Sequence, residues 1–128
     1  MEAINIEALT KSFGDLCAVD NLTLTVAEGE IFGLVGESGS GKSTAAWVVM
    51  RYLADNGRVT EGRVMFQGQN LLGFSKNELR SYRGKRIAMV YQDPMTSLNP
   101  AMTVGRQIEE VLETHNSVSK GARWKRVI

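Results

Sequence analysis

Residues 36–44 read GESGSGKST, a stretch that combines three glycines, one lysine and four hydroxyl side chains in nine positions. The spacing from Gly36 to Gly41, Lys42 and Ser43 matches the pattern G-x-x-x-x-G-K-[ST]. Glycines permit the positive φ angles that wrap a backbone into a concave nest, and they let amide N–H groups approach an anion closely. We therefore predict that this stretch is a phosphate-binding loop.

The pattern assigns a chemical role to each residue type in the loop. A helix beginning near Lys42 directs its positive end at the bound phosphates, and the ammonium of Lys42 supplies a charge to the β- and γ-phosphates. The hydroxyl of Ser43 is placed to ligate Mg²⁺. The residues predicted to contact the nucleotide in this loop are Gly36, Glu37, Ser38, Gly39, Ser40, Gly41, Lys42, Ser43 and Thr44.

The flanking sequence has the order that this motif requires. Residues 31–35 form a nearly continuous apolar run bounded by glycines, which is typical of a strand buried on both faces of a parallel sheet. Residues 43–53, STAAWVVMRYL, have the length and apolar content of a helix. The sequence therefore predicts strand, loop and helix in succession.

The remaining patterns predict an α/β fold with an antiparallel β portion at its N-terminal side. AINIEAL and NLTLTV alternate apolar and polar residues, as half-buried antiparallel strands do, and residues 61–71 read as another strand. Ser75 and Glu78 form a capping box that opens a helix through Tyr82. Residues 85–92 read as a second buried strand, and residues 103–115 read as an amphipathic helix.

Composition excludes several other classes. The chain has 128 residues, a net charge of +1 and 43% hydrophobic residues, which indicates one ordinary globular domain rather than a nucleic-acid-binding surface. It has no apolar run of roughly 20 residues and no signal-peptide pattern at its start, so we predict a cytosolic protein. The lone Cys17 is predicted to be a small buried residue without a chemical role.

Beyond the loop, the stretch GRVTEGRVMFQGQNLLGFSKNELRSYRGKRIAMVYQDPMTSLNP resembles the nucleotide-binding subunit of ABC transporters. The residues SLNP, which come after Gln92, resemble the sequence found after this glutamine in the branch of the family that imports peptides and nickel. The resemblance covers essentially the whole chain and implies an ATPase that uses ATP and Mg²⁺. It also implies that Phe13 stacks on the adenine, and that Gln92 acts with Lys42 in catalysis and reaches Mg²⁺ or a water near the γ-phosphate.

The same resemblance implies a set of partners and a location. The loop after Gln92 would contact transmembrane permease subunits, and a second ATP-binding subunit would pair head to tail with this one. An extracytoplasmic solute-binding protein would act indirectly. The protein would lie peripherally on the cytoplasmic face of the membrane.

The family pattern also contains elements that do not occur in these residues: a serine- and glycine-rich signature, a Walker B aspartate with a following glutamate, and a switch histidine. We therefore expect residues 1–128 to be the N-terminal part of a single ABC-type ATP-binding domain, incomplete at its C-terminal side. Such a part should bind ATP without hydrolysing it. Two alternatives stay open. The first is a truncated fragment that only binds nucleotide. The second is another P-loop class in which Asp93 is the Walker B acid, and Gln92 and Pro94 weigh against it.

Overall fold

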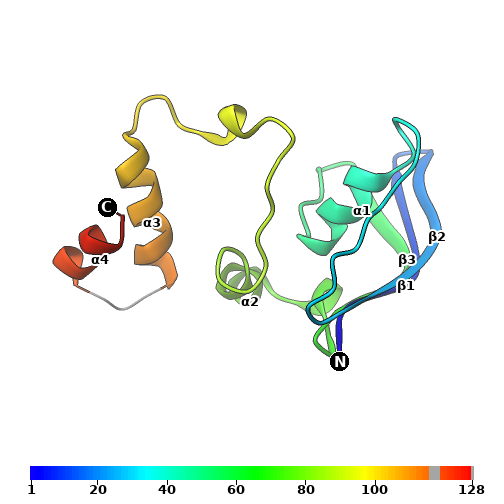
Figure 1. Cartoon of the computed structure of the whole chain (residues 1–128). Coiled ribbons are helices and arrows are strands. Elements are labelled where there is room, and N and C mark those ends of the chain that lie inside the picture. The colour runs from blue at the N-terminus through cyan, green and yellow to red at the C-terminus, as the bar shows by residue number, and fades with distance from the viewer. Residues whose placement is uncertain (116–118, 128) are drawn as a thin grey trace. The chain divides into compact units, whose positions relative to one another are not determined.

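The computed structural model describes residues 1–115 and 119–127 and divides into two compact units, Met1–Lys76 and Asn77–Ile128. The first unit holds a sheet, one helix and a short 3-10 turn. The second unit is helical, with α2 beginning at the boundary (Figure 1). The bounds are β1 Glu2–Phe13, β2 Leu16–Ala27, α1 Lys42–Val49, β3 Gly57–Phe66, β4 Gln69–Asn70, η1 Leu71–Gly73, α2 Lys76–Tyr82, η2 Pro94–Ser97, α3 Val104–His115 and α4 Lys120–Val127.

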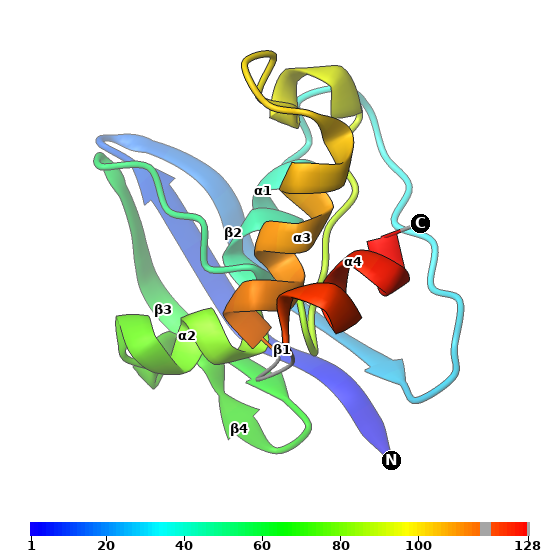
Figure 2. The ribbon, with the colours of Figure 1, turned by 90° about the vertical axis from the view of Figure 1, so that its left-hand side faces the viewer.

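The sheet of the first unit has the strand order β2-β1-β3-β4, and every pairing in it is antiparallel. β1 is the central partner of the two other long strands, since Phe13 pairs with Leu16 on β2 and with Gly57 on β3. Figure 2 shows these long strands and the short β4 that follows β3. The predicted antiparallel portion is therefore confirmed.

The core of the first unit lies between this sheet and α1. Ala45 and Val48 of α1 are buried, and Leu9 of β1 and Val64 of β3 are buried on the sheet. Burial of such apolar side chains supplies roughly 1.5–3 kcal/mol each, which is what holds an eight-residue helix that would be marginal in isolation. The helix that carries the predicted loop is thus anchored to the sheet.

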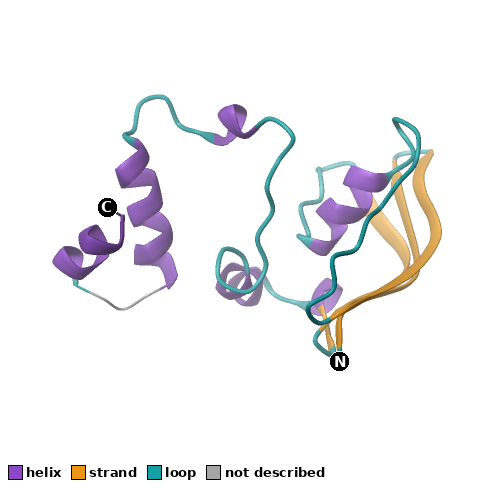
Figure 3. Cartoon of the chain, viewed as in Figure 1, coloured by secondary structure: helices purple, strands orange, loops and turns teal. Residues whose placement is uncertain are grey.

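Neither of the two buried strands that the sequence predicts is part of the sheet. Residues 31–35 lie in a loop and pair with no strand in the described part of the chain (Figure 3). Ile31 and Val35 are 100% and 94% exposed. Residues 85–92 make a single bridge, from Ile87 to Arg83, and Val90 is 89% exposed. A strand of this apolar type needs parallel neighbours with helices on both faces, and the described residues form only an antiparallel sheet.

The helices follow the predictions more closely. α2 begins one residue after Ser75, and α3 covers nearly the whole of the predicted residues 103–115. α1 ends at Val49, earlier than predicted, because Arg51 adopts a left-handed φ of 52° while its guanidinium donates to the carbonyl oxygens of Leu71 and Phe74. None of the helices formed by residues 1–115 and 119–127 has the length and apolarity that crossing a membrane requires.

The prediction for Cys17 was wrong. Cys17 is exposed, and its thiol donates to the carbonyl oxygen of Val19 at 3.3 Å. It lies on β2, an edge strand of the sheet, where a side chain has fewer neighbours to cover it. We assign it no role.

Candidate phosphate-binding site

The loop of residues 36–44 has the backbone expected of an anion nest. Gly39 and Gly41 adopt φ angles of +82° and +88°, which a side chain would make unfavourable. Gly41 is the N-cap of α1 and, having no side chain, makes no capping hydrogen bond to the first turn of that helix. The amide groups at the start of α1 are therefore left to an external acceptor, and the helix dipole favours an anion there.

Lys42 folds back over this loop. Its ammonium donates to the carbonyl oxygens of Gly36 and Glu37 at 2.8 and 2.5 Å, and to the hydroxyl of Ser40 at 3.1 Å. An ammonium has three donors, so these three oxygens hold all of them. The result is a positive charge held within the loop that the motif assigns to phosphate binding, and a bound phosphate would replace one or more of these oxygens as its partner.

The loop is seated against β2. A Cβ at Gly41 would come within 2.5 Å of the backbone oxygen of Ala18, so glycine is needed there for space as well as for conformation. A hollow of about 290 Å³ adjoins the loop, with Val19, Asp20 and Lys42 among its lining residues. The neighbouring strand thus forms one side of the candidate site.

Phe13 lies at the same end of the first unit. It ends β1 opposite Leu16, the first residue of β2, and the loop is seated two residues further along β2, at Ala18. Two residues of strand cover about 7 Å. The structure therefore brings the predicted adenine-stacking residue and the predicted phosphate loop to the same end of β2.

Lys11, which the sequence reasoning did not single out, lies directly beneath this ring. Its residue exposure is 0%, its Nζ has no hydrogen-bond partner among residues 1–115 and 119–127, and Nζ lies 4.3 Å from the centroid of Phe13. Burial lowers the pKa of Lys11 below its ordinary value. No local pattern marked it, because the register of β1 shifts between Leu9 and Lys11 and again between Lys11 and Ser12, so simple alternation along the strand does not assign Lys11 to a face.

Gln92 and Asp93 belong to the second unit. Gln92 is exposed in a bend before η2, so its predicted role near Mg²⁺ stays a prediction. The carboxylate of Asp93 accepts a hydrogen bond from the amide of Met95 at 3.1 Å and caps η2. The carboxylate therefore has a local structural role as the cap of η2.

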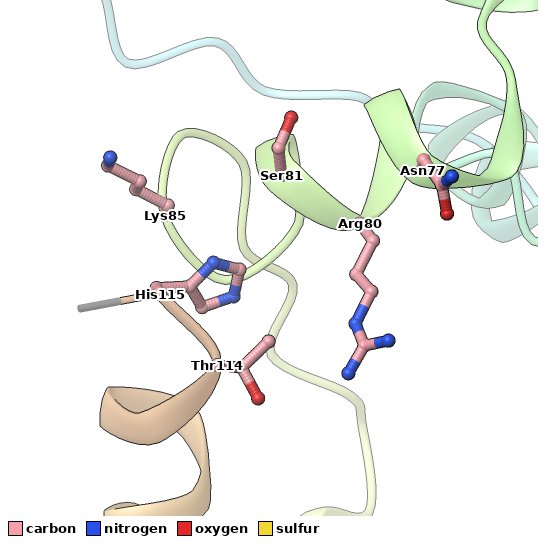
Figure 4. Close-up of a pocket in the computed structure, with 6 residues that line it drawn as sticks. All are labelled: Asn77, Arg80, Ser81, Lys85, Thr114 and His115. Carbon is pink, nitrogen blue, oxygen red and sulfur yellow. The ribbon is translucent and has the colours of Figure 1, made fainter. Parts of the chain in front are cut away.

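The second unit has a hollow of its own, of about 250 Å³ (Figure 4). Its basic character comes from Arg80 and Lys85, and the Nε2 atom of His115 lies 2.9 Å from the position that a Cβ at Gly84 would take. Its lining residues are Asn77, Arg80, Ser81, Lys85, Thr114 and His115. It shares no residue with the loop of residues 36–44.

A glycine-rich loop folded around its lysine and leading into a helix that packs on the sheet through Ala45 and Val48 is typical of a P-loop nucleoside triphosphatase fold. The chain belongs to the ABC transporter family, since the model of that family, described as "ABC transporter", matches residues 19–127.

The similar curated proteins are named for peptide transport. The chain is 42% identical over 132 residues to the dipeptide transport ATP-binding protein DppD of Escherichia coli (strain K12), covering 100% of this chain and 40% of that protein. It is 47% identical over 112 residues to the oligopeptide transport ATP-binding protein OppD of Salmonella typhimurium, covering 88% of this chain and 33% of that protein. The chain thus spans at most 40% of the length of these two relatives.

Solved structures agree on the fold. The dimeric structure of MJ0796, a bacterial ABC transporter cassette, matches with a TM-score of 0.78 at 27% identity, over 96% of this chain and 53% of that one. A post-hydrolysis state of the same cassette, bound to ADP and Pi, matches with a TM-score of 0.75 at 27% identity, over 97% of this chain and 53% of that one. The P-loop, ABC-type fold class predicted from the sequence is confirmed.

Proposed function

We propose that this chain binds MgATP at the loop of residues 36–44, as part of the subunit that energises an ABC transporter. The observation that carries the proposal is the ammonium of Lys42, held by three oxygens of the loop in front of an uncapped helix. A triphosphate entering the loop meets that charge together with the free amide groups of the first turn of α1.

The residues present fit a magnesium ion that arrives with the nucleotide. Among the described residues no group of three or more His, Cys, Asp or Glu side chains could hold a metal, so the protein alone offers no closed cage. Ser43, exposed in the first turn of α1 beside Lys42, offers one hydroxyl oxygen, and Mg²⁺ is commonly held by few protein ligands plus phosphate oxygens and water. When bound, the ion would neutralise charge on the β- and γ-phosphates.

The transported substrate follows from the relatives. Both proteins compared above are named for peptide transport, and this supports a role in the uptake of peptides. The resemblance of SLNP to the branch that imports peptides and nickel keeps a related small solute such as nickel as the second candidate. We propose that the complete protein works with permease subunits through the loop after Gln92, with a second ATP-binding subunit, and indirectly with a solute-binding protein, on the cytoplasmic face of the membrane. In that protein ATP is hydrolysed, and Gln92 acts beside Lys42.

The test of nucleotide binding is a calorimetric titration of MgATP into the 128-residue chain and into its Lys42→Met variant. A hydrogen bond to a charged group contributes about 1.5–3 kcal/mol, so we expect roughly 10- to 150-fold weaker binding. The matched control is Lys76→Met, which removes an exposed lysine and should leave the affinity unchanged. Equal affinity in the parent chain and Lys42→Met would refute the proposal.

A second measurement concerns hydrolysis. The 128 residues supply a phosphate cradle without the acid that would orient an attacking water, so phosphate release should stay at background. Turnover that is measurable in the parent chain and lost in Lys42→Met would show that the chain needs no further catalytic element.

A further inference from the structure

We propose that Lys11 is a positioning residue for the adenine base: its buried ammonium supports the inner face of the Phe13 ring, so that the outer face stacks on the base. The inference rests on the nucleotide binding proposed above. It adds a residue outside the phosphate loop that no sequence motif marks.

The first observation is the isolation of the Lys11 charge. The residue is fully buried, and no hydrogen-bond partner contacts its Nζ within the described part of the chain. Burying an ammonium without a partner is strongly unfavourable, and lysine is almost never fully buried unless paired. The ring of Phe13, whose centroid is 4.3 Å from Nζ, is the group that offsets this penalty through a cation–π interaction.

The second observation is how the ring is held. A Cβ at Gly57 would lie 3.1 and 3.3 Å from the Cε1 and Cδ1 atoms of Phe13, so the absence of a side chain at Gly57 leaves room for that edge of the ring. Gly57 is the cross-strand partner of Phe13 on β3. The ring thus has Lys11 over one face and the backbone of Gly57 beside one edge, and Phe13 remains half-exposed.

The chemistry of stacking explains why a cation belongs there. An aromatic ring carries negative charge on both faces, so two stacked rings repel unless they are offset. A cation on the inner face draws this charge toward itself and makes the outer face of Phe13 a better surface for an electron-rich purine. The ligand recognised is therefore the base of the nucleotide, whereas the loop of residues 36–44 recognises its phosphates.

A purely structural role for Lys11 makes different predictions. Replacing a buried charge by an apolar side chain of similar size is often neutral or stabilising. If Lys11 only fills space, Lys11→Met should leave binding of every ligand unchanged. If Lys11 positions Phe13, the same variant should keep or gain stability and lose affinity for ligands that carry a base.

The experiment compares MgATP with magnesium tripolyphosphate, which has phosphates but no base. We expect Lys11→Met to weaken MgATP binding about three- to tenfold and to leave tripolyphosphate binding unchanged. A loss of this size is expected if part of the free energy of the cation–π interaction between Lys11 and Phe13 contributes to stacking on the base. Its melting temperature should equal or exceed that of the parent chain. Lys11→Arg, which keeps a cation over the ring, should retain most of the affinity for MgATP.

A double-mutant cycle with Phe13→Ala completes the test. Without the ring, Lys11→Met should cause no further loss of MgATP affinity. Equal losses for MgATP and tripolyphosphate, no loss for either, or a Lys11→Met chain that does not fold would each overturn the inference. These results are distinct from failure of the proposed function, in which MgATP does not bind the parent chain or binds it no better than it binds Lys42→Met; that failure would overturn both.

Discussion

The substitution Gly41→Ala should disrupt the phosphate loop through two separate effects, and a control variant can distinguish them. The first is conformational, because Gly41 has a φ of +88°. A left-handed conformation costs a non-glycine residue about 1–2 kcal/mol. The second is steric, because the new Cβ would lie 2.5 Å from the backbone oxygen of Ala18, about 0.9 Å short of the 3.4 Å at which ordinary van der Waals contact begins.

Gly39 provides the matched control. Its φ of +82° is nearly the same, and a Cβ there would meet nothing within 4 Å. Gly39→Ala should therefore cost about 1–2 kcal/mol of the free energy of unfolding from the backbone alone. Gly41→Ala adds an overpacking term of about 1–3 kcal/mol, for a total of roughly 2–5 kcal/mol.

The assay is urea unfolding of the parent chain and both variants, followed by the fluorescence of Trp47 in α1. The extra cost of Gly41→Ala should lower the midpoint by roughly 1 M urea relative to Gly39→Ala, since small proteins lose about 1–3 kcal/mol per molar urea. Affinity for MgATP should also fall more in Gly41→Ala, because the N-cap of α1 must shift. If Gly39→Ala is as destabilised as Gly41→Ala, the contact with Ala18 does not constrain the loop.

Two further predictions concern the second unit. Asp93→Asn should leave the Kd for MgATP within about twofold, because the Asp93 carboxylate caps η2; a tenfold loss would revive Asp93 as a metal-binding acid. A hydrogen bond from Arg106 holds the pKa of Glu109 below its ordinary 4.5, so this interaction stabilises α3 above that pH and is lost as the pH falls through the lower folded value. Circular dichroism should show an acid-induced loss of helix that Glu109→Gln lacks; an identical acid profile for Glu109→Gln would contradict it.

Local patterns predicted the elements whose partners are near in sequence. The alternation that marks β1 and β2 was read correctly, because the two strands pair across a short turn after Phe13. The buried strands expected at residues 31–35 and 85–92 have the right composition but pair with no neighbouring strand in the described residues. Apolar content indicates that a segment is suited to a parallel sheet, and it does not supply the partners that such a sheet requires.

The features of the candidate site also fall into two groups, those set by adjacent residues and those set by tertiary packing. The φ angles of Gly39 and Gly41 and the start of α1 beside Lys42 were predictable, because a motif of adjacent residues specifies them. The contact of Gly41 with Ala18 and the burial of Lys11 under Phe13 arise from tertiary packing. A lysine in an alternating strand is usually solvated, so its burial could be recognised only with the neighbouring side chains in place.

The extended, unpaired segment of residues 31–35 bears on how strongly the loop can hold a ligand. The loop is fixed at one end by α1 and joined at the other to a stretch with no strand partner in the described residues. Ordering a residue costs about 1–2 kcal/mol of conformational entropy. A strand that paired with residues 31–35 would hold this end of the loop in place before the nucleotide arrives, and it would tighten nucleotide binding without contacting the nucleotide.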